Sequence, residues 1–255
     1  MKNSRPLPKH PVDISEADGV RYLHFGSEWV QGAMRIARPW SLELEYTREM
    51  MFSLLLREPL TWPRSALLVG LGAGSLARFI YRYLPDCKIT AVEINPQVEF
   101  IARQYFRLPE DARLRVRIGC AADYILAGGP SFDLILSDGF DAHGRPGILD
   151  SQPFYQACRA RLTPNGLFCV NLLREKGFAS SVDRIQKTFD GKTCILPPCA
   201  SGNTQLFAHG GAGVDVSFSE LAERAAQLKT ATRLKLQDSL QRLQAAHPAA
   251  DTLRF

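Results

Sequence analysis

The sequence lacks the features that mark membrane, secreted and nucleic-acid-binding proteins. It contains no run of about 18 apolar residues that could span a membrane, and its first 19 residues carry prolines and scattered charges instead of an apolar leader. The net charge is +5, yet the basic residues are scattered and no run of about five or six forms a nucleic-acid-binding arm. These absences predict a cytoplasmic protein whose partners include neither nucleic acid nor a membrane.

Paired cysteines are also missing. The sequence has six cysteines, none of which forms a CxxC pair or a metal-ligand spacing: Cys87, Cys120, Cys158, Cys169, Cys194 and Cys199. Reduced thiols are the usual state of such cysteines in the cytoplasm. We therefore expect no metal site and no disulfide framework. Internal repeats are absent as well.

From residue 65 onward, apolar strand-like runs alternate with helical patterns, which is typical of a parallel sheet. Strands are expected at 66–70, 88–93, 114–118, 132–137 and 167–171, helices at 75–84, from 96 onward and at 152–162, and a turn at 163–166. The segments 193–196 and 204–208 are expected to close the sheet as an antiparallel pair. The predicted fold class is α/β, a Rossmann-like doubly wound and mostly parallel sheet.

Two smaller parts flank this region. Residues 1–62 contain short apolar patches broken by glycine and proline, followed by a helical pattern at 43–56, and predict a small β-rich lobe with a connecting helix. The catalytic domain is expected at 63–212. Residues 213–255 begin with a capping box, Ser217 and Glu220, and continue with helical leucine spacing, so one C-terminal helix is expected.

Three glycines at alternate positions follow the first expected strand, in the string Gly70-Leu71-Gly72-Ala73-Gly74-Ser75. Without a Cβ atom, glycine lets the backbone turn sharply and approach a ligand closely. A dinucleotide-binding turn has the spacing GxGxxG, which fails here at Ser75. The spacing GxGxG instead suits an adenosyl sulfonium, whose tail lies across the glycines. A purely structural turn and a nicotinamide-dependent dehydrogenase are the alternatives.

An acidic residue, Glu93, ends the second expected strand. A carboxylate at this place can accept hydrogen bonds from both ribose hydroxyls of a nucleoside. An acid about 20 positions beyond the glycines is also expected in NAD-binding proteins, so Glu93 does not discriminate alone. Together with the GxGxG turn, it favours an S-adenosyl ligand.

Two aspartates, Asp138 and Asp141, directly follow the expected strand 132–137. Ligands of open α/β sheets bind at the carboxyl ends of the strands, so Asp138 should face the site. An alkylamine is protonated at neutral pH, and one carboxylate can take its proton while the other holds an ammonium group. Aspartates are also common turn formers, which is the structural alternative. The loop at 142–150, rich in glycine and proline, is expected to cover the site.

Between Leu67 and about Leu173, the sequence resembles the spermidine synthase family of polyamine aminopropyltransferases. The resemblance rests on the glycine turn, the string Val92-Glu93-Ile94, the segment 119–124, the Asp138-x-x-Asp141 pair and Pro153-Phe154-Tyr155, with weaker similarity at 31–51. It implies the class I S-adenosylmethionine-dependent methyltransferase type of fold and a homodimer without metal. It also implies decarboxylated S-adenosylmethionine as aminopropyl donor and a diamine or polyamine as acceptor.

The resemblance assigns roles to individual residues. Asp138 is the implied base, and Asp141 helps to hold the acceptor, with Tyr46 as a further acceptor contact. Glu93 is implied to bind the ribose. The residues implied to bind the donor are Gln31, Gly70, Gly72, Gly74, Glu93, Ile94, Cys120 and Ala121.

The sequence departs from the family pattern at several positions. The family's glycine turn carries an aspartate that holds the donor's terminal ammonium, and Ala73 stands in its place. Cys120 replaces an aspartate that would accept from the adenine amino group. The string that contains Tyr46 is one residue longer than in the family, and Ala142 replaces a proline. Basic side chains at 145, 174 and 176 are unfavourable for a polycationic acceptor.

Three functions therefore remain open. Aminopropyl transfer to a diamine or polyamine is the leading hypothesis. Methyl transfer from intact S-adenosylmethionine is the second hypothesis. The tail of the intact donor carries a carboxylate, for which an aspartate at position 73 would be unfavourable and Ala73 is not. A nucleoside-binding protein without activity is the third.

Overall fold

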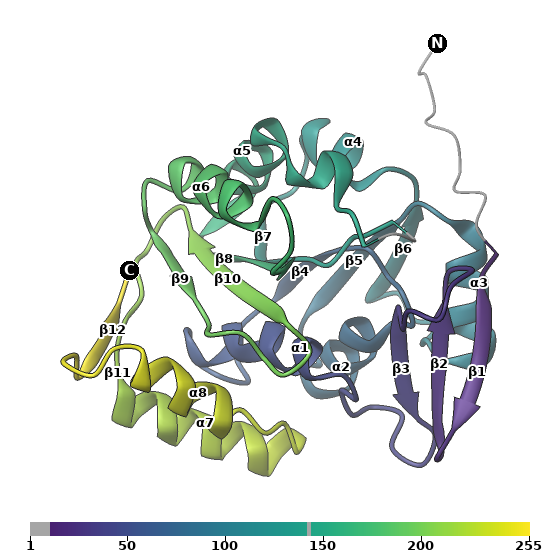
Figure 1. Cartoon of the computed structure of the whole chain (residues 1–255), viewed down its shortest axis with the longest axis horizontal. Coiled ribbons are helices and arrows are strands. Elements are labelled where there is room, and N and C mark those ends of the chain that lie inside the picture. Colours follow the sequence, from purple (N-terminus) through teal and green to yellow (C-terminus); the bar gives the residue numbers. More distant parts are fainter. Residues whose placement is uncertain (1–10, 142–143) are drawn as a thin grey trace.

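The computed structural model describes residues 11–141 and 144–255 (Figure 1). Its centre is a seven-stranded sheet in the order β6-β5-β4-β7-β8-β10-β9. The strands are β4 (Ser65–Val69), β5 (Lys88–Glu93), β6 (Leu114–Ile118), β7 (Phe132–Ser137), β8 (Leu162–Leu173), β9 (Thr193–Ile195) and β10 (Asn203–His209). The neighbours from β6 to β8 are parallel, and β10 is antiparallel to both β8 and β9, as predicted.

The order of the strands reverses at β4. From β4 the chain first adds β5 and β6 on one side, then returns to add β7 and β8 on the other. Such a switch point leaves a crevice at the carboxyl ends of the strands, where α/β proteins bind ligands. The predicted fold class is confirmed.

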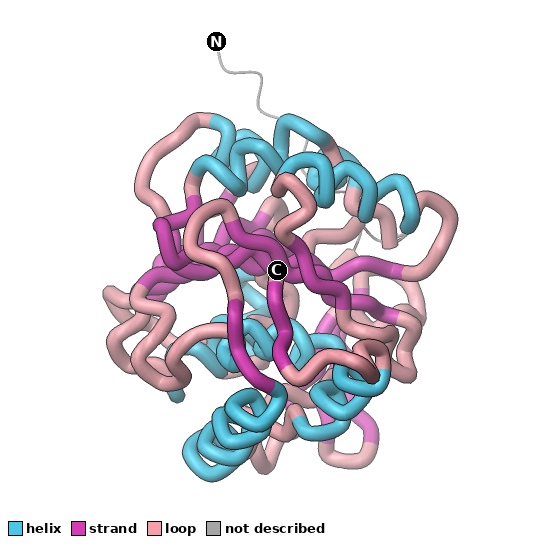
Figure 2. Tube along the Cα trace, turned by 90° about the vertical axis from the view of Figure 1, so that its left-hand side faces the viewer, coloured by secondary structure: helices cyan, strands magenta, loops and turns pink. Residues whose placement is uncertain are grey.

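Helices cover both faces of the sheet, so that the molecule has three layers (Figure 2). The apolar residues of β4 alternate between the two faces. Ala66 and Leu68 pack in one core with α1 (Glu45–Met50), α2 (Ser75–Tyr83), α3 (Pro96–Tyr105) and α7 (Phe218–Thr232). Leu67 and Val69 pack in a second core with α4 (Ala121–Leu126), α5 (Gln152–Ala160) and α6 (Phe178–Thr188). Strands buried on both faces explain the continuous apolar runs in the sequence.

The N-terminal lobe is an antiparallel sheet of β1 (Asp13–Ala17), β2 (Val20–His24) and β3 (Gly32–Arg35). The sequence predicted strands here from the patches around β2 and β3. It did not indicate β1, because that strand is mostly exposed and lacks apolar alternation. A small cluster of Leu23, Met34, Ala73 and Phe106 joins the lobe to the glycine turn.

Helix boundaries follow local signals in the sequence. Asn95 caps α3 by accepting from the Gln97 N–H, with Pro96 at the first helical position. The Ser217 side chain caps α7 in the same way, by accepting from the Glu220 N–H. The pattern expected to form one helix at 43–56 is divided between α1 and a 3-10 helix, Met51–Leu55.

Two expectations about the chain after residue 160 were wrong. The expected turn at 163–166 lies inside β8. Phe132 of β7 pairs with Leu162 of β8, and Leu134 pairs with Leu167, so two residues of β7 lie opposite five residues of β8. The turn residues therefore form a bulge within a longer strand.

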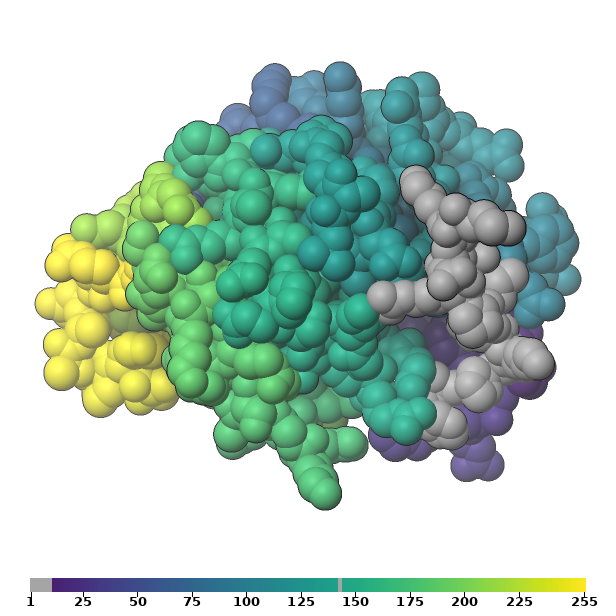
Figure 3. Space-filling model, turned by 90° about the horizontal axis from the view of Figure 1, so that it is seen from above, coloured from purple at the N-terminus to yellow at the C-terminus, as the bar shows by residue number. Residues whose placement is uncertain are grey.

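The C-terminal segment is not one helix either. It folds as α7, α8 (Gln237–Ala245) and β12 (Thr252–Arg254), which pairs with β11 (Asp215–Ser217). Arg233, whose φ is 64°, ends α7 in the left-handed region, and leucine spacing alone does not reveal this break. Seen from above, this segment and the N-terminal lobe lie at opposite ends of the molecule (Figure 3).

Within the described ranges, no helix has the length and apolar character needed to cross a membrane. The same residues contain no group of three or more His, Cys, Asp or Glu side chains arranged to hold a metal ion.

Candidate active site

A cavity of about 530 Å³ lies at the switch point, between the carboxyl ends of the central strands and the N-terminal lobe. Nearly all the residues predicted for the site line it: Gln31, Tyr46, Gly70, Gly72, Glu93, Ile94, Cys120, Ala121, Asp138 and Asp141. Gly74 does not. A Cβ atom at that position would lie 2.8 Å from Leu108 Cδ1, so Gly74 allows close packing at the start of α2.

The glycine turn is packed against two other segments of the chain. Gly70 has a φ of 91°, and a Cβ atom there would lie 2.6 Å from the carbonyl oxygen of Asp138. Gly72 has a φ of 51°, and its Cβ atom would lie 3.2 Å from the carbonyl oxygen of Gln31. Both glycines are therefore required by the fold as well as by any ligand that lies across the turn.

Glu93 ends β5 with its carboxylate buried behind this turn. Oε2 accepts from the Leu71 N–H at 3.0 Å, and Oε1 accepts from the Asn95 N–H at 2.9 Å. Burial raises the pKa of Glu93, although these backbone hydrogen bonds oppose the shift. The backbone N–H groups of Ile94 and Gly72 also act on this carboxylate and oppose the shift. The sequence did not indicate that Glu93 also fixes the shape of the turn.

Ala73, the departure from the family pattern, is only 2% exposed. A Cβ atom at Gly32 would lie 2.6 Å from the Ala73 Cβ, so β3 packs directly on the turn. Below the turn, the fully buried Arg78 donates to the carbonyl oxygens of Ala73 (2.8 Å) and Phe106. Burial lowers the pKa of Arg78 to about 9. The turn thus has a buried cation behind its backbone at Ala73, and Arg78 itself does not line the cavity.

Asp138 lies at the end of β7 and is held by a buried polar network. Its Oδ1 accepts from Asn171 Nδ2 at 3.0 Å, and Asn171 Oδ1 accepts from Gln205 Nε2 at 3.1 Å. The Tyr46 hydroxyl also hydrogen-bonds to Asp138. Burial raises the pKa of Asp138, and the bonds from Asn171 and Tyr46 oppose this shift. The carboxylate is therefore only partly exposed and is held by two donors, as a base for an amine should be.

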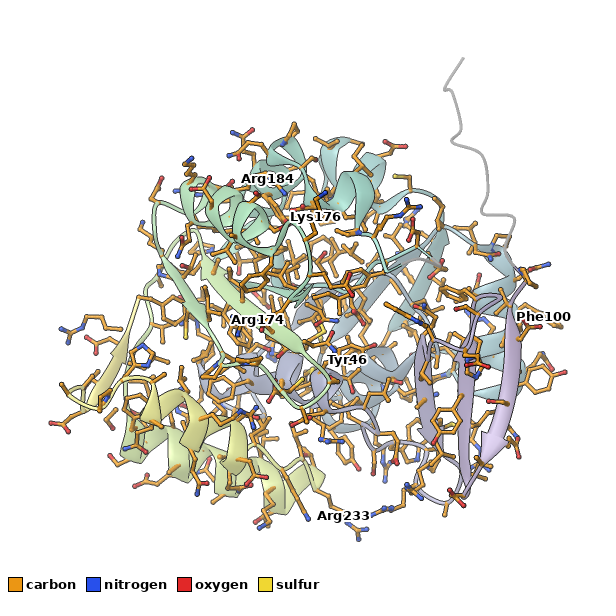
Figure 4. The ribbon with its side chains drawn as sticks, viewed as in Figure 1. Tyr46, Phe100, Arg174, Lys176, Arg184 and Arg233 are labelled. Atoms are coloured by element: carbon orange, nitrogen blue, oxygen red, sulfur yellow. The ribbon has the colours of Figure 1, made fainter. Side chains whose placement is uncertain are left out.

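Tyr46 stays protonated because burial and the neighbouring Asp138 raise its pKa far above the ordinary value. Figure 4 shows Tyr46 near the middle of the molecule, on α1. This helix is tied to the C-terminal segment through the buried Glu49. The Glu49 carboxylate accepts from Ser239 Oγ at 2.9 Å and pairs with Arg242, both on α8.

Asp141 has a different environment from Asp138. Its Oδ2 lies 2.9 Å from Arg145 Nη2, and its Oδ1 accepts from the Arg145 backbone N–H at 2.9 Å. These contacts close the loop that the sequence predicted as a cover. Residues 144–149 of that loop line the cavity, and residues 142–143 lie outside the described part. The carboxylate of Asp141 is thus engaged in shaping the loop.

The other two basic residues that are unfavourable for a polycation, Arg174 and Lys176, do not line the cavity. Both lie in the segment between β8 and α6 (Figure 4). The Arg174 guanidinium lies 5.3 Å from the centre of the Phe178 ring, over a separate surface groove beside α6. Among the described lining residues, Arg145 is the cationic side chain.

Sequence reasoning missed the residues that support the site from outside the motifs. Asn171 and Gln205 interrupt apolar strands, and a polar residue inside such a strand was the signal available. Trp29 and Leu173, which also line the cavity, carried no signal.

Comparison with known proteins gives a consistent picture. The model of the family described as spermine/spermidine synthase domain matches residues 43–192. A polyamine aminopropyltransferase of Neisseria meningitidis is 37% identical over 239 residues, which cover 93% of this chain and 90% of that protein.

Two solved structures share the fold. The probable spermidine synthase of Corynebacterium glutamicum is 18% identical, with a TM-score of 0.72 over 90% of this chain and 87% of that one. Human methyltransferase-like protein 13 in complex with SAH is 31% identical, with a TM-score of 0.66 over 74% of this chain and 93% of that one. By the family match and the identity to the Neisseria protein, this chain belongs to the spermine/spermidine synthase family.

Proposed function

We propose that the protein transfers an aminopropyl group from decarboxylated S-adenosylmethionine to an amine and releases methylthioadenosine. The observation that carries this proposal is Asp138, a partly buried carboxylate of raised pKa that two donors hold at the switch point, beside the glycine turn. The resemblance gives diamines and polyamines as the acceptor class. A homodimer in the cytoplasm, without metal, belongs to the same proposal.

The donor would bind with its adenosyl group along the carboxyl ends of β4 and β5. Glu93 would accept from the ribose hydroxyls, while Ile94, Cys120 and Ala121 would enclose the adenine. The sulfonium and its tail would lie across Gly70 and Gly72, beneath Gln31. The Neisseria aminopropyltransferase and the SAH-bound human relative both support a site for an S-adenosyl compound.

Asp138 would act as the general base. The acceptor arrives as an ammonium ion, whose ordinary pKa is about 10.4. Asp138 takes one proton, and the freed nitrogen lone pair attacks the aminopropyl carbon bonded to sulfur. As the carbon–nitrogen bond forms, the carbon–sulfur bond breaks and its electron pair stays on sulfur, which leaves neutral methylthioadenosine. Because burial raises the pKa of Asp138 towards that of the amine, the proton transfer becomes less uphill.

Methyl transfer from intact S-adenosylmethionine is a second candidate. It is favoured by the tail region, where Ala73 replaces the carboxylate of the family and the buried Arg78 lies behind the turn. An aspartate at position 73 would repel a carboxylate tail, and Ala73 does not. The SAH-bound methyltransferase relative agrees with this candidate.

Product analysis separates the two functions. The protein is incubated with an amine mixture and either the decarboxylated or the intact donor, and the nucleoside products are identified by mass spectrometry. Methylthioadenosine from the decarboxylated donor is expected, and its loss in Asp138→Asn. Asp86→Asn, at an exposed aspartate, is the matched control and should retain activity. S-adenosylhomocysteine from the intact donor alone would instead establish methyl transfer.

A further inference from the structure

The two carboxylate oxygens of Asp141 contact different parts of Arg145. Oδ1 accepts a hydrogen bond from the Arg145 backbone N–H at 2.9 Å. Oδ2 faces the guanidinium, with Nη2 at 2.9 Å and Nε at 3.0 Å. Because the backbone and the guanidinium bind separate oxygens, the guanidinium can leave Oδ2 while the hydrogen bond at Oδ1 stays in place.

Backbone hydrogen bonds hold this part of the covering loop without the guanidinium. The Asp141 N–H donates to the Arg145 carbonyl oxygen at 2.9 Å, and the Gly144 N–H donates to the Asp141 carbonyl oxygen at 3.0 Å. The Arg145 side chain is 69% exposed, and an ion pair as exposed as this one adds little to the stability of a fold. The loop therefore does not depend on the ion pair for its shape.

The same ion pair lies where the proposed acceptor would bind. Asp141 and Arg145 both line the cavity, and Arg145 supplies the positive charge among the described lining residues. A diamine brings one nitrogen that reacts at Asp138 and a second that stays an ammonium group. Asp138 and Asp141 are three residues apart, so their Cα atoms are at most about 11 Å apart, which a short diamine and the two side chains can bridge. The guanidinium therefore occupies the oxygen that the second ammonium group needs.

We propose that Arg145 is an exchangeable counter-ion of Asp141, which the second ammonium group of the acceptor displaces from Oδ2. The displaced guanidinium turns into solvent, to which it is already mostly exposed. Arg145 thus competes with the acceptor and sets the concentration of diamine at which the site fills. This inference rests on the proposed function, because it takes Asp141 as the residue that holds the acceptor.

Titration calorimetry with putrescine tests the exchange. Putrescine is titrated into the full chain saturated with methylthioadenosine, for the original protein and for Arg145→Gln. Removal of the competing charge should tighten putrescine binding by about two- to five-fold, which is the effect of one exposed ion pair. Unchanged or weaker binding by Arg145→Gln overturns the proposal, and so does the absence of putrescine binding to both proteins.

Arg64→Gln is the matched control. Arg64 is 66% exposed and lies 3.6 Å from the Asp86 carboxylate, and it does not line the cavity. Its substitution lowers the net charge by the same amount as Arg145→Gln and should leave the affinity for putrescine unchanged. A gain as large as that of Arg145→Gln would assign the effect to net charge and contradict the exchange.

A double-mutant cycle shows whether Arg145 acts through Asp141. Asp141→Asn removes the negative charge but keeps an oxygen that can accept the backbone N–H, so the loop should keep its shape. In this background, Arg145→Gln should no longer tighten putrescine binding. An equal gain in both backgrounds would mean that the arginine repels the acceptor directly, and the exchange would be rejected.

Turnover with the decarboxylated donor separates the inference from the reaction. The gain in Arg145→Gln should appear as a lower KM for putrescine, and a change confined to kcat speaks against competition for Asp141. A protein that shows the exchange by calorimetry but forms no methylthioadenosine keeps the inference and loses the proposed reaction. A protein that forms methylthioadenosine with the same KM in both variants keeps the reaction and loses the inference.

Discussion

Replacing Asn171 by leucine tests how the polar network controls Asp138. Leucine has nearly the shape of asparagine but lacks the Nδ2 donor that lies 3.0 Å from Asp138 Oδ1. That hydrogen bond favours the ionised carboxylate, so its loss raises the pKa of Asp138 further above the ordinary value. At neutral pH a larger fraction of the protein then carries a protonated, inactive base.

The size of the effect follows from the charge on the acceptor. A hydrogen bond to an ionised group contributes about 1.5–3 kcal/mol. Since each 1.36 kcal/mol corresponds to one pKa unit, the pKa of Asp138 should rise by about one to two units, and kcat should fall by about 10- to 100-fold at pH values on the acidic limb. The loss should shrink as the pH rises and the carboxylate ionises again, so the acidic limb of the pH–kcat profile moves to higher pH.

The assay is the pH dependence of kcat, measured by methylthioadenosine release. Asn203→Leu is the matched control, because Asn203 also lines the cavity but donates to Ser201 Oγ at 2.8 Å instead of to Asp138. Its acidic limb should stay in place. An Asn171→Leu enzyme whose acidic limb is unmoved, or displaced to lower pH, would refute the assigned role of this hydrogen bond.

Three further predictions concern stability. Burial raises the pKa of Asp138, so its ionised form destabilises the folded state as the pH rises above the unfolded value. Asp138→Asn should therefore raise the free energy of unfolding at neutral pH by about 1 kcal/mol, seen as a higher Tm, with a smaller gain in acid. Gly32→Ala should cost about 1–3 kcal/mol in urea unfolding because its Cβ atom meets Ala73, and adding Ala73→Gly should recover only part of this, since the Ala73 backbone nitrogen would still lie 2.9 Å from the new Cβ atom. Arg242→Met, which leaves the Glu49 carboxylate short of a partner, should cost about 1–3 kcal/mol in urea unfolding.

Each of these predictions has an outcome that contradicts it. A lower Tm for Asp138→Asn at neutral pH would show that the carboxylate stabilises the fold. Strictly additive effects of the Gly32 and Ala73 substitutions would mean that the two residues do not press on each other. If Arg242→Met and the original chain have equal free energies of unfolding, the ion pair between Arg242 and Glu49 does not stabilise the position of α8.

The sequence predicted the parts of the site that depend on local signals. Alternating strands and helices bring the carboxyl ends of β4, β5 and β7 to one edge, so the glycine turn, Glu93 and Asp138 could be placed together from their positions alone. The antiparallel pair of β9 and β10 at the edge of the sheet could also be predicted, because each strand forms a short apolar run.

The parts that depend on tertiary neighbours could not be predicted. Whether Asp141 faces a ligand or Arg145 depends on tertiary structure, because Asp141 follows the end of β7 and belongs to no predicted helix or strand. Gln205 is linked to Asp138 through Asn171, and the hydrogen bond between Gln205 and Asn171 joins residues that are 34 positions apart, on β10 and β8. The contact of Gly32 with Ala73 joins two different sheets, and no periodicity in the sequence encodes it.

The link between α8 and Glu49 has a consequence for how the reaction centre is built. Tyr46 lies on the short helix α1. Glu49 of the same helix is held by Ser239 and Arg242, almost 200 residues later in the chain. The stretch that matches the family, 43–192, contains Asp138 and Tyr46 but neither Ser239 nor Arg242. A protein trimmed to that stretch would keep Asp138 and Tyr46 but lose the contacts that hold α1 in place.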